Sequence, residues 1–141
     1  MQSVVDASVV AKWFIPESHK QPAERLLRDF ICGHLDLCAP DLLVAETGNI
    51  LWKRCAQRGE ITPAQAATSF RHLLLLGVRL HPSTELATMA LELAIAEHRS
   101  LYDMLYLALA ERENCDLITA DEKLFRALGG SFPRIRWIGN L

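Results

Sequence analysis

The chain has 141 residues, half of them hydrophobic, which suits a single folded domain and argues against intrinsic disorder. Its net charge of −2 shows no basic excess, so composition alone gives no sign of a nucleic-acid-binding surface. The longest apolar run, residues 104–110, is too short to span a membrane, and no basic segment precedes an apolar stretch near the N-terminus, so we expect a cytoplasmic protein without a signal peptide.

The first predicted element is a short buried strand. Residues 1–5 include β-branched side chains and show no helical stripe, and Asp6 follows directly at the carboxyl end of the strand. A turn with large apolar side chains, residues 12–16, separates this strand from a helix that opens at Pro22 and closes before Gly33. Open parallel sheets bind ligands at the carboxyl ends of their strands, so the position of Asp6 indicates a site.

Strands and helices alternate through the rest of the chain. Thr62 and Ser100 each precede a helical pattern and form the signature of a capping box with the residue three places on. Further strands are predicted at 35–39, 78–80, 116–120 and 134–138. Further helices are predicted at about 41–57, 63–76, 83–98, 102–112 and 121–128. This alternation predicts an α/β sandwich around a mostly parallel sheet, in one domain that spans 1–141.

The cysteine and histidine patterns argue against a zinc site. The four cysteines form no CxxC pair, and the five histidines form no HExxH motif. We therefore interpret the cysteines as buried thiols, with disulfides and zinc ligands as the alternatives.

Four acidic residues stand at the ends of strands or within helical patterns. Taken singly, Asp6 could be a turn residue and Glu46 a solvated helix residue. Asp103 could complement a helix dipole, and Asp121 could be a simple N-cap. Together they indicate a site, because Asp6 and Asp121 end strands at the same edge of the sheet. Carboxylates gathered there repel one another unless a cation lies between them, and all-oxygen ligands suit Mg²⁺ or Mn²⁺.

Four segments of the chain resemble, in the same order, the four motifs of PIN-domain ribonucleases. They are residues 4–9, 40–46, 100–110 and 117–124. These segments carry Asp6, Glu46, Asp103 and Asp121 at the acidic positions of the family, and none of those positions is missing. The size of the chain and the turn at 12–14 resemble the VapC-type toxins of bacterial and archaeal toxin–antitoxin pairs.

The resemblance implies a PIN-like three-layer α/β/α sandwich and a metal-dependent endoribonuclease. Asp6, Asp103 and Asp121 would hold Mg²⁺ or Mn²⁺, and Glu46 would complete the shell directly or through water. A metal-activated water would attack the phosphodiester in line and leave a 5′-phosphate and a 3′-hydroxyl.

Hydroxyl and basic residues near the acids are candidates for supporting roles. Ser8 and Thr119 each lie two residues from an acid and could orient the carboxylates or a metal-bound water. RNA contacts are expected from basic residues close in sequence to the acids, with solvated surface charge as the alternative. These candidates are Lys12, Lys53, Arg54 and Lys123.

The resemblance also implies three kinds of partner. They are an RNA substrate, a cognate antitoxin protein and a second copy of the chain in a homodimer. Trp13, Phe14 and Trp52 look exposed in the sequence and would support such contacts.

Two rival functions stay open at this point. A catalytically silent PIN-like module would bind RNA or a protein without cleaving, and a nuclease assay with and without metal separates it from the enzyme. A haloacid-dehalogenase-type phosphatase also starts from an aspartate after its first strand. That chemistry needs a second aspartate two residues on, where this chain has Ser8.

Overall fold

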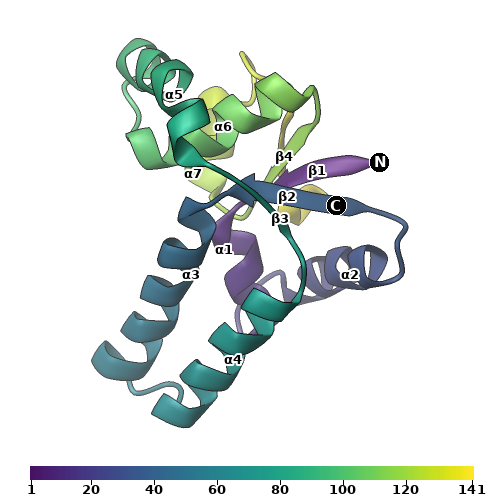
Figure 1. Cartoon of the computed structure of the whole chain (residues 1–141), viewed down its shortest axis with the longest axis vertical. Helices are drawn as coiled ribbons and strands as arrows, with labels where there is room; N and C mark the ends of the chain where they lie inside the picture. Colours follow the sequence, from purple (N-terminus) through teal and green to yellow (C-terminus); the bar gives the residue numbers. More distant parts are fainter.

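The computed structural model describes residues 1 to 141 and has a five-stranded parallel sheet at its centre (Figure 1). The strands are β1 (Gln2–Val5), β2 (Asp36–Pro40), β3 (Arg79–His81), β4 (Asp116–Thr119) and β5 (Ile135–Trp137). Their order is β3-β2-β1-β4-β5, and every neighbouring pair is parallel. The connections leave β1 towards opposite edges of the sheet, so the order reverses between β1 and β4. Doubly wound sheets bind their ligands at such a reversal.

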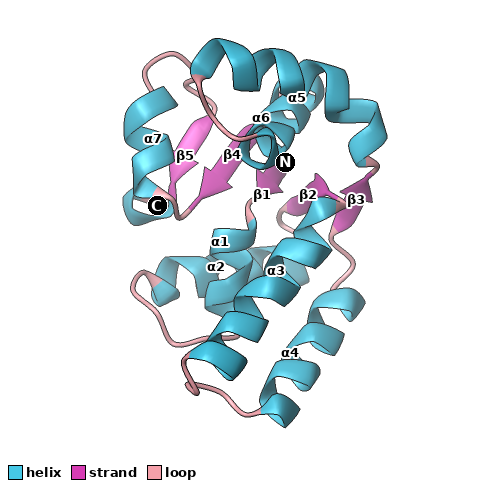
Figure 2. Ribbon diagram, turned by 90° about the vertical axis from the view of Figure 1, so that its left-hand side faces the viewer, coloured by secondary structure: helices cyan, strands magenta, loops and turns pink.

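Helices cover both faces of this sheet (Figure 2). They are α1 (Ala7–Val10), α2 (Lys20–Ile31), α3 (Leu42–Trp52), α4 (Pro63–Leu75), α5 (Ser83–Glu97), α6 (Leu101–Glu113) and α7 (Glu122–Leu128). One face carries α5 and α6, the other carries α1 to α4, and α7 lies beside β5. The predicted three-layer α/β/α sandwich is therefore confirmed.

The helix α6 forms the centre of one layer. Its residues from Met104 to Ala110 are all buried, because the helix lies between α5 and the strands β1, β2 and β4. A helix enclosed in this way needs no polar face, which explains why its sequence is apolar nearly all round. The enclosed position also fixes the first turn of α6 against the edge of the sheet where the acids gather.

The helices α3 and α4 form a hairpin that points away from the sheet (Figure 1). A π-helical turn, Lys53–Gln57, continues α3. We call α3, this turn and α4 the arm. At the start of α4, Thr62 and Gln65 form a complete capping box, as predicted. The buried residues of the arm are Leu43, Thr47 and Leu51 in α3 and Leu73 in α4.

Two helix starts differ from the sequence prediction. The four-residue helix α1 begins directly after Asp6 and was missed, because so short a helix has no periodic pattern to detect. The helix α2 begins at Lys20, so Pro22 is its third residue rather than its first. Both differences concern the first turn of a helix, where boundaries predicted from sequence are least exact.

The predicted capping box at Ser100 is only half formed. Ser100 Oγ accepts the backbone N–H of Asp103 at 3.2 Å, but Asp103 makes no return bond to the Ser100 backbone N–H. The carboxylate of Asp103 is therefore not used to close the helix end.

The expected buried thiols are found for two of the four cysteines. Cys38 and Cys115 are buried, Cys55 is partly buried, and Cys32 is exposed, so the expectation was wrong for the last. All four are free thiols. None of the helices is both long and apolar enough to cross a membrane.

Candidate active site

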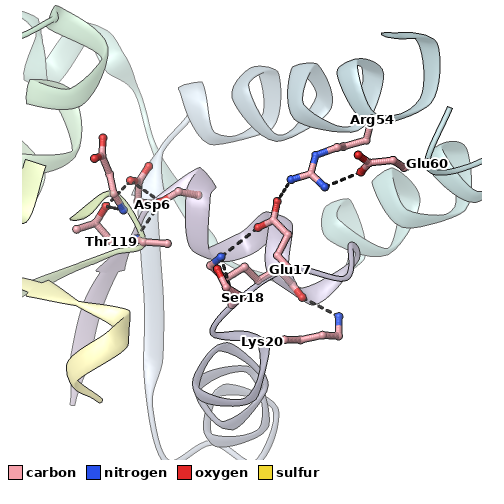
Figure 3. A network of polar contacts seen from close by, with 11 residues as sticks. Asp6, Glu17, Ser18, Lys20, Arg54, Glu60 and Thr119 are labelled. Atoms are coloured by element: carbon pink, nitrogen blue, oxygen red, sulfur yellow. Dashed lines mark hydrogen bonds and ion pairs between the residues drawn. The ribbon is translucent and has the colours of Figure 1, made fainter. Parts of the chain in front are cut away.

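The carboxylate of Asp6 is held where β1 passes into α1. Its Oδ2 accepts hydrogen bonds from Ser8 Oγ at 2.9 Å and from Thr119 Oγ1 at 2.8 Å (Figure 3). Each hydroxyl accepts a backbone N–H in turn, Ala120 to Ser8 and Asp121 to Thr119, both at 3.0 Å. Since a hydroxyl has one hydrogen to donate, both hydrogens are committed to Asp6. The two predicted supporting residues therefore fix the orientation of one acid.

The other three acids come from three separate elements around Asp6. Glu46 lies in α3, Asp103 in the first turn of α6, and Asp121 is the N-cap of α7, where it accepts the N–H of Leu124 at 3.1 Å. The charges of Asp6 and Asp103 both act on Glu46, and the charge of Asp121 acts on Asp103. The fold thus brings the four predicted acids to the carboxyl end of the sheet.

Burial and mutual repulsion raise the pKa of three of these carboxyls. For Asp6, burial raises the pKa most, the two hydroxyls oppose the rise, and the Asp103 charge adds to it. For Glu46, burial again raises the pKa most, and the charges of Asp6 and Asp103 add to the rise. For Asp103, burial raises the pKa most, followed by the charge of Asp121. A cation among these groups would relieve the repulsion.

The donor set fits a hard divalent cation. All four acids offer carboxylate oxygens, and Glu46 Oε1 is buried without a hydrogen-bond partner. Such oxygens suit Mg²⁺ or Mn²⁺. As the side chains stand, no three of the Asp, Glu, His or Cys groups are arranged together as metal ligands. Direct coordination by several acids would therefore require side-chain rotation, or water between some of them and the ion.

Two of the predicted RNA contacts are held in ion pairs within the protein (Figure 3). Lys12 Nζ donates to Glu17 Oε2 at 3.1 Å and to the Ser18 carbonyl at 2.8 Å, and its side chain is buried. Arg54 pairs with Glu17 and, at 2.7 Å, with Glu60. These pairs join the loop after α1 to the end of α3. Lys12 and Arg54 are thus engaged in the structure, and neither presents a free cation.

Three other basic residues, Lys53, Arg99 and Lys123, form no ion pair within the protein. Lys53 and Lys123, both predicted, have exposed side chains. Arg99 was not predicted from the sequence; its charge lowers the pKa of Asp103, and its Nε is buried without a hydrogen-bond partner. The only sequence feature that could have identified Arg99 is its position, four residues before the motif acid Asp103.

The aromatic residues at 13, 14 and 52 are not equally exposed. Trp13 is buried and donates its ring N–H to the Ala23 carbonyl at 2.8 Å, so the expectation of an exposed Trp13 was wrong. Phe14 is half-buried, whereas Trp52 is 51% exposed. Trp52 borders an apolar hollow of about 360 Å³ between α3 and α4. This hollow is also lined by Gly48, Leu51, Cys55, Pro63, Ala66 and Phe70.

Comparisons with known proteins agree with this geometry. Residues 3–130 match the family model described as the PIN domain, and the match includes all four acids. Ribonuclease VapC3 of Pyrobaculum aerophilum is 32% identical over 137 residues, which cover 96% of this chain and 98% of that relative. The crystal structure of PAE2754 from Pyrobaculum aerophilum has a similar fold, with a TM-score of 0.68 and 24% identity, over 99% of this chain and 94% of that chain.

Proposed function

This chain belongs to the PIN-domain family, and we propose that it is the ribonuclease toxin of a toxin–antitoxin pair, cutting RNA at its four-carboxylate site. The observation that carries the proposal is the meeting of Asp6, Glu46, Asp103 and Asp121 at the reversal point of the sheet. Three of these acids, Asp6, Glu46 and Asp103, have raised pKa values, so it is unfavourable to keep their charges together, and a fold that does so indicates a use for them.

The four acids would hold Mg²⁺ or Mn²⁺. The ion would neutralise charge on the scissile phosphate and lower the pKa of the attacking water. Asp6 is the best oriented of the ligands, because Ser8 and Thr119 fix its carboxylate. Asp103 and Asp121 approach from the starts of α6 and α7, and Glu46 approaches from α3.

The RNA backbone would run past basic residues that form no ion pair within the protein. Lys53, Lys123 and Arg99 are the candidates, since Lys12 and Arg54 are bound to Glu17. Hydrolysis would add water to the phosphorus and break its bond to the 3′ oxygen, leaving a 5′-phosphate and a 3′-hydroxyl. With a net charge of −2, the protein depends on such local contacts rather than on a basic surface.

The test is RNA cleavage by the purified protein with Mg²⁺, with Mn²⁺ and with excess chelator. Cleavage should require one of the two ions and should disappear in Asp6→Asn. Asp29→Asn is the matched control, because Asp29 is an exposed aspartate on α2. Cleavage that persists in chelator would contradict the metal mechanism. RNA binding without cleavage under all conditions would favour a catalytically silent module.

The proposed partners are a cognate antitoxin and a second copy of the chain. Exposed apolar side chains on the arm and on α5 support these proposals, among them Trp52, Leu75, Leu91 and Ile95. Light scattering at tens of micromolar, with and without the product of the neighbouring gene, tests both. A monomer that binds no such product would contradict them.

A further inference from the structure

Two of the five buried side-chain polar atoms that lack a hydrogen-bond partner belong to residues of the acid site that act on each other's pKa. They are the hydroxyl of Tyr106 and Oε1 of Glu46. Tyr106 is only 2% exposed, and no lysine, arginine or histidine is paired with Glu46. An unpaired polar atom in such a position is unfavourable, so two of them at one site call for an explanation.

The surroundings of Tyr106 make its hydroxyl a donor. Tyr106 lies in α6, three residues after Asp103, so the two side chains project from the same side of the helix. Burial, followed by the charges of Asp6 and Glu46, raises the pKa of Tyr106 far above its usual range. A tyrosine hydroxyl has one hydrogen to donate, and an ionised carboxylate can only accept. Glu46 is the acceptor within reach, since the Tyr106 hydroxyl lowers the pKa of Glu46.

The apolar character of α6 makes the hydroxyl conspicuous. Every other residue from Met104 to Ala110 is a Met, Leu or Ala, and all of them are buried. A phenylalanine would fill the position of Tyr106 equally well if only hydrophobic contact mattered. A tyrosine rather than a phenylalanine at position 106 is therefore explained by a hydrogen bond that its hydroxyl can donate.

We propose that Tyr106 donates its hydroxyl hydrogen to Glu46 and so holds that carboxylate towards Asp6, in position for the cation and the RNA phosphate. This inference rests on the proposed function for its purpose, but the Tyr106–Glu46 bond can be tested without it. Tyr106 is a positioning residue, because it acts through Glu46 rather than on the substrate.

The first experiment measures melting temperature in chelator. Tyr106→Phe removes only the hydroxyl, and it should lower the melting temperature by roughly 3–8 °C, as expected for loss of a hydrogen bond to a charged group. In a Glu46→Met background the same change should be neutral or stabilising, because the hydroxyl there has no acceptor. Equal losses in both backgrounds, or no loss in either, would overturn the proposal.

The second experiment measures Mn²⁺ binding by calorimetry, without RNA. Tyr106→Phe should weaken binding by roughly 10–100-fold, the usual effect of removing a group that orients a metal ligand. Tyr102→Phe is the matched control, because Tyr102 lies on the same helix and is 60% exposed. It should bind Mn²⁺ within twofold of the wild type. Binding by Tyr106→Phe within twofold of the wild type would overturn the positioning role.

The two experiments separate this inference from the proposed function. If the wild type neither binds Mn²⁺ nor cleaves RNA, the proposed function is wrong and the positioning role falls with it. The melting comparison would still decide whether Tyr106 and Glu46 are bonded. If the wild type cleaves RNA and the melting losses are equal in both backgrounds, only the Tyr106 inference is wrong.

Discussion

The acid end of the sheet and the arm are built in opposite ways. At the acid end, Asp6 accepts two side-chain hydrogen bonds, and Thr119 and Tyr106 are almost completely buried. In the arm, Leu73 is the only buried residue of α4, and Leu75 is 83% exposed. The acid end of the sheet holds charged groups in a buried setting, whereas the arm leaves apolar side chains exposed to solvent.

The difference shows where each kind of unfavourable group can be tolerated. Crowded carboxylates need neighbours that cannot move, because any slack would let them turn apart into solvent. Exposed apolar side chains need no such support, but they favour contact with another surface. The acid end is therefore suited to chemistry, and the arm is suited to a partner.

The largest expected effect comes from removing one charge at the acid end. Asp6→Asn keeps the shape and keeps an oxygen that can accept from Ser8 and Thr119. RNA cleavage should be lost, yet the melting temperature in chelator at pH 7 should rise by a few degrees, for about 1 kcal/mol of relieved repulsion in a domain of this size. Added Mg²⁺ should stabilise the wild type more than the variant.

The control for this change is Asp29→Asn, which should alter neither RNA cleavage nor the melting temperature in chelator. An Asp6→Asn protein that is inactive but less stable than the wild type in chelator would contradict the idea of a crowded carboxylate cluster.

The second prediction concerns pH. The folded-state pKa of Asp6, Glu46 and Asp103 is raised, so each carboxyl binds its proton more tightly in the folded state than in the unfolded state. Their contribution to stability is fully present below the unfolded pKa, near 4, and is lost as pH rises through the folded pKa. Urea unfolding in chelator measures the free energy of unfolding across pH 4 to 8.

The comparison with Asp6→Asn isolates one of these groups. The difference in the free energy of unfolding between variant and wild type should grow in favour of the variant as pH rises, and then level off. A difference that does not change with pH would mean that the Asp6 pKa is not raised.

The third prediction compares the N-cap hydroxyl residue of a helix at the acid end with that of a helix in the arm. Ser100 caps α6 at the acid end, and Thr62 caps α4 in the arm, each by accepting a backbone N–H. Ser100→Ala and Thr62→Ala should each lower stability by about 1 kcal/mol. Only Ser100→Ala should also reduce RNA cleavage several-fold, because Ser100 holds the turn that carries Asp103. Equal activity in the two variants would indicate that this turn is fixed by other contacts.

The smallest expected effect on the isolated protein comes from the arm. Trp52→Ser removes a side chain that is half exposed, so stability should change by only about 0.5 kcal/mol and cleavage should not change. Pull-down with the neighbouring gene product should show weaker binding. If cleavage falls instead, the Trp52 side chain itself takes part in handling RNA.

Much of the fold could be predicted from local patterns. The strand at β4, the long helix that ends at Gln57 and the capping box at Thr62 all follow from periodicity and cap chemistry. The short helix α1 could not be predicted, since four residues are too few to show a period. The Ser100 box was predicted as complete, but its second bond does not form.

The candidate site was predicted in part. The four acids were identified by their motifs, and Ser8 and Thr119 by their spacing from acids. Lys12 and Arg54 had the right charge and the right neighbours in sequence, but Glu17 pairs with both of them. Arg99 and Tyr106 lie beside the acids in the structure and had no signal strong enough to single them out.

The sequence by itself determined the order of strands and helices and the identity of the four acids. Periodicity, caps and motifs depend on residues a few positions apart, so they can be read along the chain. Only the tertiary structure decided that β1 lies between β2 and β4, that Glu17 pairs with Lys12 and Arg54, and that Tyr106 lies near enough to Glu46 to affect its pKa. Except for the Lys12–Glu17 pair, those contacts join residues distant in the chain, and packing of the helices on the sheet determines which of them meet.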